Sequence, residues 1–136
     1  MTVVTSRSDF EKLIELRLRE AKLLLVSKEW DGAYYLAGYA VEFALKIKII
    51  AHLMNSNSFP EKKLADNFYK HELTLLRKMA KLDIEMDNDA TVSTQWDIVK
   101  DWNEQTRYET GKQENDAKDF IEAIEQGVLP WIKARW

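Results

Sequence analysis

The hydrophobic pattern is strongest between Trp30 and Met54, in the run WDGAYYLAGYAVEFALKIKIIAHLM. Apolar residues recur there at spacings of three and four, which is the period of a helix face. One face carries Leu36, Ala40, Phe43, Ile47, Ile50 and Met54, and an adjoining face carries Ala33, Ala37, Val41, Ala44 and Leu45. Two adjoining faces exceed the single stripe of a surface helix. The pattern predicts a central helix of about 25 residues, roughly 37 Å long, that contacts two or three neighbours or a second subunit.

Polar and small residues within this run limit what the helix can be. Glu42, Lys46 and Lys48 interrupt the apolar sequence, so we do not expect a membrane span. Gly38 lowers helix propensity by about 1 kcal/mol relative to alanine. We therefore expect another element to approach the helix closely at Gly38.

The flanking segments predict a helical hairpin at the start of the chain. Ser8 and Glu11 have the spacing of a capping box, which predicts a first helix from this point to about Ser27. The short link at Ser27–Glu29 is typical of antiparallel helix pairs. The first two helices should therefore pack against each other in opposite directions.

Three further helices are predicted downstream: His71–Leu82, Ala90 to about Trp102, and a last one from about Glu114. Between them we expect an acidic connector at Asp83–Asp89 and a loop at Glu104–Gly111. Pro130 should kink the last helix or begin a new turn in it, because proline lacks a backbone N–H.

Only two prolines and four glycines occur in the 136 residues, which is little turn chemistry for a sheet protein. The length is sufficient for one domain with its own core. We therefore predict an all-α fold, an up-and-down four-helix bundle with one extra or broken helix. This single domain should cover residues 1–136.

Composition excludes several kinds of chemistry. The chain has no cysteine, so disulfides, thiolate catalysis and cysteine metal sites are excluded. Two isolated histidines predict no zinc cluster, and no glycine-rich phosphate loop is present. The acidic run at Asp83–Asp89 lacks the glycine and glutamate of a calcium loop. We expect no metal and no cofactor.

Charge and the N-terminal sequence bear on the partners and the compartment. The net charge is −3 and the isoelectric point is about 5.5, which gives no global electrostatic reason to bind nucleic acid. A local basic patch remains compatible with these values. The first ten residues lack the apolar core of a signal peptide, so we expect a cytoplasmic protein.

Three sequence landmarks occur in an order that suggests a family. They are WDxAYYLAGYAVExxLK at 30–46, HEL at 71–73 and RY at 107–108. Together they resemble HEPN domains, small helical domains often found beside minimal nucleotidyltransferases. The resemblance implies a commonly dimeric four- or five-helix bundle tied to nucleotide or RNA handling. It also implies a nucleotidyltransferase-type protein partner and a place in a toxin–antitoxin or defence-type system.

Many members of this family cleave RNA without metal, through an arginine and a histidine separated by four to six residues. The reaction needs a basic group to move the 2′-hydroxyl proton and a guanidinium to hold the phosphate. This pair is absent here, since Lys46 stands where His52 would need an arginine and no arginine precedes His71 at that distance. We therefore expect no catalytic residues.

Four residues are candidates for ligand binding: Arg107, Tyr108, His71 and Lys46. An arginine beside an aromatic ring can hold a phosphate or stack on a base. Each basic candidate also has a structural alternative, which we favour for Lys46 and His71. Lys46 can pair with Glu42 one turn earlier, and His71 can serve as a cap. Arg107 can likewise pair with a carboxylate such as Asp97, Asp101 or Glu109.

Aromatic residues have a second set of candidate roles. Tyr35, Tyr39 and Trp102 are expected in the core or in a dimer interface. The tyrosines of the central run span more than one face of the helix, so at least one should lie at the rim of the core. Trp96, Trp102, Trp131 and Trp136 fall at helical spacings, so we expect core or dimer contacts rather than base stacking.

The sequence favours a HEPN-like module that binds a nucleotide, an RNA or a protein partner and forms a homodimer without catalysing a reaction. Two alternatives stay open. One is a metal-independent endoribonuclease with a degenerate site, using Arg107, Tyr108 and His71. The other is a helical dimerisation protein without a small ligand, which would be indifferent to nucleotides.

Overall fold

The computed structural model describes residues 6–54 and 66–136, and every regular element in these ranges is helical. The elements are α1 (Arg7–Val26), α2 (Trp30–Met54), α4 (Leu73–Met79), α5 (Asp83–Asp87), α6 (Ala90–Val99), the 3₁₀ helix η1 (Glu104–Tyr108), α7 (Glu114–Ala123), the π-helical turn η2 (Ile124–Val128) and α8 (Leu129–Lys133). None of them is long and apolar enough to cross a bilayer. The predicted all-α fold class is confirmed.

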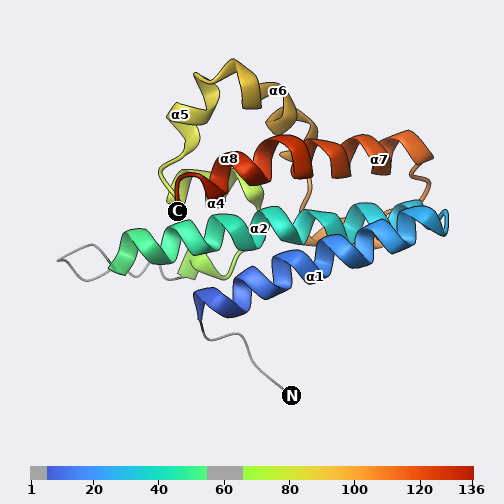
Figure 1. Cartoon of the computed structure of the whole chain (residues 1–136), viewed down its shortest axis with the longest axis horizontal. Coiled ribbons are helices and arrows are strands. Elements are labelled where there is room, and N and C mark those ends of the chain that lie inside the picture. Colours follow the sequence, from blue (N-terminus) through green and yellow to red (C-terminus); the bar gives the residue numbers. More distant parts are fainter. Residues whose placement is uncertain (1–5, 55–65) are drawn as a thin grey trace.

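The helices form a bundle around α2 (Figure 1). The chain passes forward through α1, back through α2, forward through the short helices α4, α5 and α6, and back through α7, η2 and α8. Helix α1 packs along one side of α2, and the α7–α8 segment packs along another. Helices α5 and α6 lie outside the α7–α8 segment. The third passage of this up-and-down order is therefore broken into short pieces.

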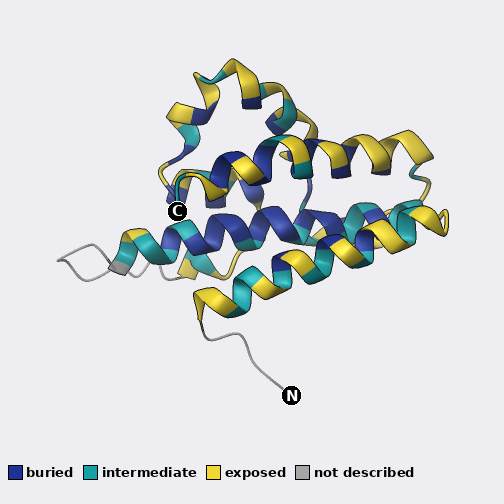
Figure 2. Cartoon of the chain, viewed as in Figure 1, coloured by how far each residue is buried: buried dark blue, intermediate teal, exposed yellow. Residues whose placement is uncertain are grey.

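The bounds of α2 agree with those predicted from the hydrophobic pattern. Its second predicted face, Ala33, Ala37, Val41, Ala44 and Leu45, is fully buried. On the first face, Ala40 and Ile47 are buried and Leu36, Phe43 and Ile50 are half-buried, while the side chain of Met54 lies outside the described part. Figure 2 shows burial along most of the helix. Helix α2 can be buried so widely because α1, α4, η1, α7 and α8 all contact it.

The glycine within α2 allows an indole ring to lie against the helix backbone. A Cβ atom at Gly38 would be 2.1 Å from Cε2 of Trp102, so any larger residue would collide with the ring. The Trp102 indole is buried, and its Nε1 donates to the backbone carbonyl of Tyr35 at 3.0 Å. This contact accounts for the low helix propensity at Gly38.

The predicted hairpin of α1 and α2 is confirmed, but the predicted cap of α1 is wrong. Ser6, not Ser8, is the N-cap, because its extended backbone lets its hydroxyl accept from the N–H of Asp9 at 3.2 Å. At the other end, Lys28 has a φ of 64° and the N–H of Glu29 donates to the carbonyl of Leu24 at 2.9 Å. This left-handed residue reverses the chain into α2.

The two helices predicted within residues 71–102 are correct in type and wrong in extent, and the connector predicted between them is wrong in type. The helix expected over His71–Leu82 covers only Leu73–Met79, because Lys81 adopts a φ of 62° and ends it. The expected connector at Asp83–Asp89 contains α5, a short helix held by the buried side chain of Met86. Helix α6 ends at Val99, three residues before Trp102.

The C-terminal helix changes its winding where the proline was expected to disturb it. Helix α7 passes into the π-helical turn η2, and α8 then begins at Leu129 with Pro130 as its second residue. Proline is tolerated there because the N–H groups of a first helical turn have no partner within the helix. The prediction of a new turn at Pro130 is confirmed.

Candidate functional site

A buried carboxylate on α2, Glu42, is the centre of a polar cluster. Glu42 and Lys46 lie one helical turn apart and expose 1% and 6% of their surface. Lys46 Nζ is 3.4 Å from Oε2 of Glu42, and Nδ1 of His71 is 2.8 Å from Oε1. The ammonium group also lies 5.4 Å from the ring centroid of Phe68. The buried charge of Glu42 is therefore compensated by basic groups at both oxygens.

His71 connects the buried pair to the surface. It lies two residues before α4, half-buried, and its Nε2 is 3.1 Å from Oε2 of Glu104. Each ring nitrogen thus faces a different carboxylate. Only an imidazole that carries a proton on both nitrogens can place a proton at both contacts.

The short helix η1 supplies the outer part of the cluster. Its first residue, Glu104, places Oε1 3.3 Å from Nη1 of Arg107, and the guanidinium lies 4.8 Å from the ring centroid of Tyr108. The Tyr108 side chain, and then the charge of Glu104, raise the pKa of Arg107 above its usual value, so the guanidinium remains charged. Asn103 fixes η1 by accepting from the N–H of Gln105 at 2.8 Å.

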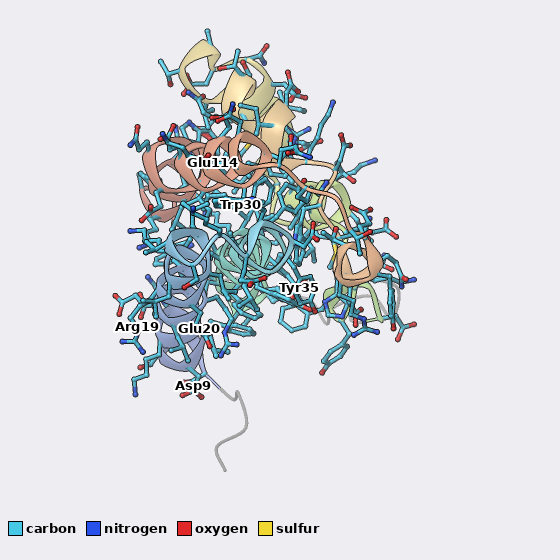
Figure 3. The ribbon with its side chains drawn as sticks, turned by 90° about the vertical axis from the view of Figure 1, so that its right-hand side faces the viewer. Asp9, Arg19, Glu20, Trp30, Tyr35 and Glu114 are labelled. Atoms are coloured by element: carbon cyan, nitrogen blue, oxygen red, sulfur yellow. The ribbon has the colours of Figure 1, made fainter. Side chains whose placement is uncertain are left out.

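Two tyrosines of α2 extend the cluster toward Arg107. The hydroxyl groups of Tyr35 and Tyr39 are 2.7 Å apart, and the two rings meet edge to face. Burial, followed by the hydrogen bond with Tyr35, raises the pKa of Tyr39 well above its usual value. The Tyr35 side chain also interacts with Arg107. Figure 3 shows Tyr35 on the side of α2 that faces η1.

An open cavity of about 490 Å³ lies beside the cluster, lined by Tyr69, Lys70, His71, Glu72, Asn103, Glu104 and Gln105. Its size is within the range of small-ligand sites. Tyr69 is strongly exposed. The cavity therefore combines one aromatic ring, two amides, two carboxylates and two basic side chains within reach of one ligand.

The four predicted ligand-binding residues belong to one continuous set of contacts. His71 and Lys46 both meet Glu42, Arg107 joins them through Glu104, and Tyr108 joins them through Arg107. Lys46 is buried behind His71, so only the other three lie near the cavity or the surface. Arg107 pairs with Glu104 rather than with Asp97, Asp101 or Glu109.

The aromatic candidates surround the same cluster. Trp102 is in the core against Gly38, while Tyr35 and Tyr39 are half-buried beside it. The tyrosine and indole rings of residues 39 and 102 meet edge to face, with centroids 4.9 Å apart. The three side chains thus pack against one another within one chain.

Sequence reasoning did not identify Glu42 and Glu104 as site residues. A signal existed for each of them. Glu42 is a carboxylate set into an apolar helix one turn before a lysine, which predicts a buried pair. Glu104 precedes Arg107 by three residues, a spacing at which opposite charges meet on a helix.

The cluster can hold charges in place, but neither ring nitrogen of His71 is free to act as a general base. Both ring nitrogens of His71 face carboxylates, and a base must reach the proton that it removes. Across residues 6–54 and 66–136, no group of three or more His, Cys, Asp or Glu side chains has an arrangement that could hold a metal ion. No family model, curated protein or solved structure matches the chain. The resemblance to HEPN domains therefore stays a prediction.

Proposed function

We propose that the chain is a non-catalytic helical binding module of the HEPN type, and that its ligand is a nucleotide or the end of an RNA. One observation carries this proposal: His71 and Arg107, from distant segments, converge beside a cavity of about 490 Å³. A guanidinium and an imidazole together suit a phosphate group. The resemblance favours the same ligand class.

The remaining side chains around the cavity suit the other parts of a nucleotide. Tyr69 lines the cavity and Tyr108 lies beside Arg107. Both are strongly exposed, and an exposed ring offers a surface on which a base can stack. The amides of Asn103 and Gln105 can donate to or accept from the edge of a base. Aromatic and amide groups therefore complement the basic pair.

Binding without catalysis agrees with the contacts of His71. An endoribonuclease that used Arg107, Tyr108 and His71 would need Glu104 to leave Nε2 before a proton could move. The resemblance to HEPN domains favours a protein that works with a nucleotidyltransferase-type partner in a toxin–antitoxin or defence-type system.

Ligand binding is tested by thermal unfolding with mononucleotides and short RNAs. A ligand at about a hundred times its dissociation constant should add ~2.7 kcal/mol to the stability of the folded state. The gain should shrink in Arg107→Ala, because the guanidinium beside Glu104 is lost. Lys118→Ala, which removes one positive charge from an exposed position on α7, is the control and should keep it.

The outcomes distinguish nucleotide or RNA binding from protein binding and from RNA cleavage. A stabilisation that Arg107→Ala abolishes and Lys118→Ala preserves supports the proposal. Absence of stabilisation by every nucleotide and RNA contradicts it and leaves a protein-binding role. If the wild type cleaves RNA and Arg107→Ala does not, the protein is an endoribonuclease and not a binding module.

A second function, self-association, is favoured by an apolar groove of about 410 Å³ on the outer face of α1. Leu23 and Val26 are strongly exposed in this groove, with Leu18 beneath them. Exposed apolar residues gathered in one place mark interaction surfaces. We infer that a second copy of the chain covers this groove in a homodimer.

A further inference from the structure

We infer that the carboxylate of Glu104 occupies the position in which this site accepts a terminal phosphate, and that such a phosphate competes with Glu104 for His71 and Arg107. The inference rests on the proposed function and names the ligand group and the residue that controls access to it. It makes Glu104 an anionic substitute for the ligand within the chain itself.

The geometry of Glu104 is the first reason. Its two oxygens are divided between two basic groups, with Oε2 3.1 Å from Nε2 of His71 and Oε1 3.3 Å from Nη1 of Arg107. A phosphate monoester has three strong acceptor oxygens and a charge between about −1.5 and −2 near pH 7. Two of these oxygens could replace those of the carboxylate, and the third would face the cavity.

The ability of Glu104 to leave is the second reason. Its side chain is 32% exposed, whereas that of Glu42, the other carboxylate on His71, is 1% exposed. Exposed ion pairs are weak because water screens both partners. Rotation of Glu104 into solvent would free the outer nitrogen of His71 while Glu42 continued to hold the inner one.

The charge balance is the third reason. Lys46 and Nδ1 of His71 meet Glu42 in the interior, whereas Nε2 of His71 and the guanidinium of Arg107 meet Glu104 at the surface. Lys70 lines the same cavity and adds another positive charge near the opening. An anion that replaced Glu104 would therefore meet basic groups from three positions of the chain.

The cavity contains a matched control for this inference. Glu72 lines the same cavity, but it is Glu104 that pairs with both His71 and Arg107. Glu72→Gln and Glu104→Gln each remove one negative charge from the lining. Only Glu104→Gln should also free the two basic groups.

The test is calorimetric titration of the full chain with inorganic phosphate, adenosine 5′-monophosphate and adenosine. Glu104→Gln should lower the dissociation constants of the two phosphate compounds by roughly three- to tenfold, the range expected for removal of an exposed competing ion pair. Glu72→Gln should change them by less than about twofold. Adenosine has no phosphate group that could compete with Glu104, so neither variant should alter its dissociation constant.

A second readout locates the anion and keeps the test independent of small affinity changes. In Glu104→Gln, phosphate should shift the nuclear magnetic resonance signal of His71 Nε2, and His52, which lies exposed near the end of α2, should stay unchanged. Glu104→Asp keeps the charge but shortens the side chain, so its affinity for phosphate should fall between those of the wild type and Glu104→Gln.

Several outcomes would overturn the inference. Equal effects of Glu72→Gln and Glu104→Gln would reduce it to a general charge effect, and weaker phosphate binding by Glu104→Gln would make Glu104 part of the ligand site. Binding of nucleotides by the wild type without any effect of Glu104→Gln would leave the proposed function intact. Phosphate binding by Glu104→Gln alone, with no nucleotide or RNA bound by the wild type, would instead contradict the proposed function.

Discussion

Glu42 determines how His71 is presented to the cavity. Its Oε1 holds Nδ1 of the imidazole at 2.8 Å, which leaves Nε2 directed toward Glu104. A buried charge of this kind is expensive to desolvate, and it persists only when it is paired. Lys46 completes the pair from the same helix. The buried part of the cluster therefore belongs to α2 alone.

We expect Glu42→Gln to lower the free energy of unfolding by about 3 kcal/mol, because it leaves the ammonium of Lys46 buried without its carboxylate. The double variant Glu42→Met with Lys46→Met should lose less, since it removes both buried charges. Urea denaturation at neutral pH measures both effects.

Glu11→Gln is the matched control for this prediction. Glu11 also pairs with a basic residue four positions away, Arg7, but both side chains are about half exposed. Its loss should change the free energy of unfolding by less than about 0.5 kcal/mol. Equal effects of Glu11→Gln and Glu42→Gln would show that the burial of Glu42 has no energetic consequence.

Residue pairs close in sequence could be predicted, whereas those that join distant segments could not. The spacing of Glu42 and Lys46 predicts their contact. Nothing in the sequence places His71 against Glu42, because 29 residues separate them. The contact of Gly38 with Trp102 was foreseen only in part, since the glycine predicts a close neighbour without identifying it.

Among the elements, length decides what the sequence predicts. The bounds of α2 follow from its hydrophobic period, because the period continues through all 25 residues of the helix, or about seven turns. Helices α5 and η1 have five residues each, too few for a period to be recognised. Contacts with distant residues hold them: the buried Met86 holds α5, and the segment after η1 is tied to α2 where Asp31 accepts from the N–H of Lys112 at 2.9 Å.

Asp89 links two elements, and this link should depend on pH. Its carboxylate caps α6 by accepting from the N–H of Thr91 at 3.0 Å, and it accepts from Nε1 of Trp131 in α8 at 2.8 Å. Hydrogen bonds, first from the Thr91 side chain and then from Trp131, hold the pKa of Asp89 below its usual value of 3.8. A lowered pKa means that the folded state favours the charged carboxylate.

The stabilisation from Asp89 is therefore present above the unfolded pKa and is lost as the pH falls through the lower folded pKa. We expect Asp89→Asn to lower the urea midpoint at about pH 6, and the gap to the wild type to close as the pH falls below the folded pKa. Urea titrations over this pH range measure the effect.

Asp97→Asn, on the same helix, is the control. Asp97 is exposed and pairs with Lys100 at 3.6 Å, so its replacement should change the urea midpoint by less than Asp89→Asn does. A constant gap between the wild type and Asp89→Asn at all pH values would contradict a role for the charge of Asp89.

At the scale of the whole molecule, α2 separates two surfaces. Figure 3 shows α1 and η1 on opposite sides of α2. The cavity of the polar cluster lies on the η1 side, and the apolar groove lies on the outer face of α1. The proposed ligand binding and the proposed self-association would therefore use different faces of the bundle, and we expect that each can be changed without the other.

The charges around the groove suit a second copy related by a twofold axis. Two antiparallel α1 helices that meet between Leu18 and Arg19 would bring Glu15 of each copy opposite Lys22 of the other, where Lys22 already pairs with Glu125 of its own chain. A twofold interface requires a surface that complements itself. We expect the wild type to be a dimer in analytical ultracentrifugation, and Leu23→Asp to be a monomer because it places a charge in the apolar groove.

Ile84→Asp, at an equally exposed apolar position on α5, places the same charge outside the groove and should remain a dimer. Nucleotide binding should be the same in Leu23→Asp and in the wild type, because the cavity lies across α2. A monomeric wild type would contradict self-association through α1, and a dimer that survives Leu23→Asp would move the interface to another face. Loss of nucleotide binding together with the dimer would instead mean that the two faces are coupled through α2, and the buried pair of Glu42 and Lys46 would then be the first connection to examine.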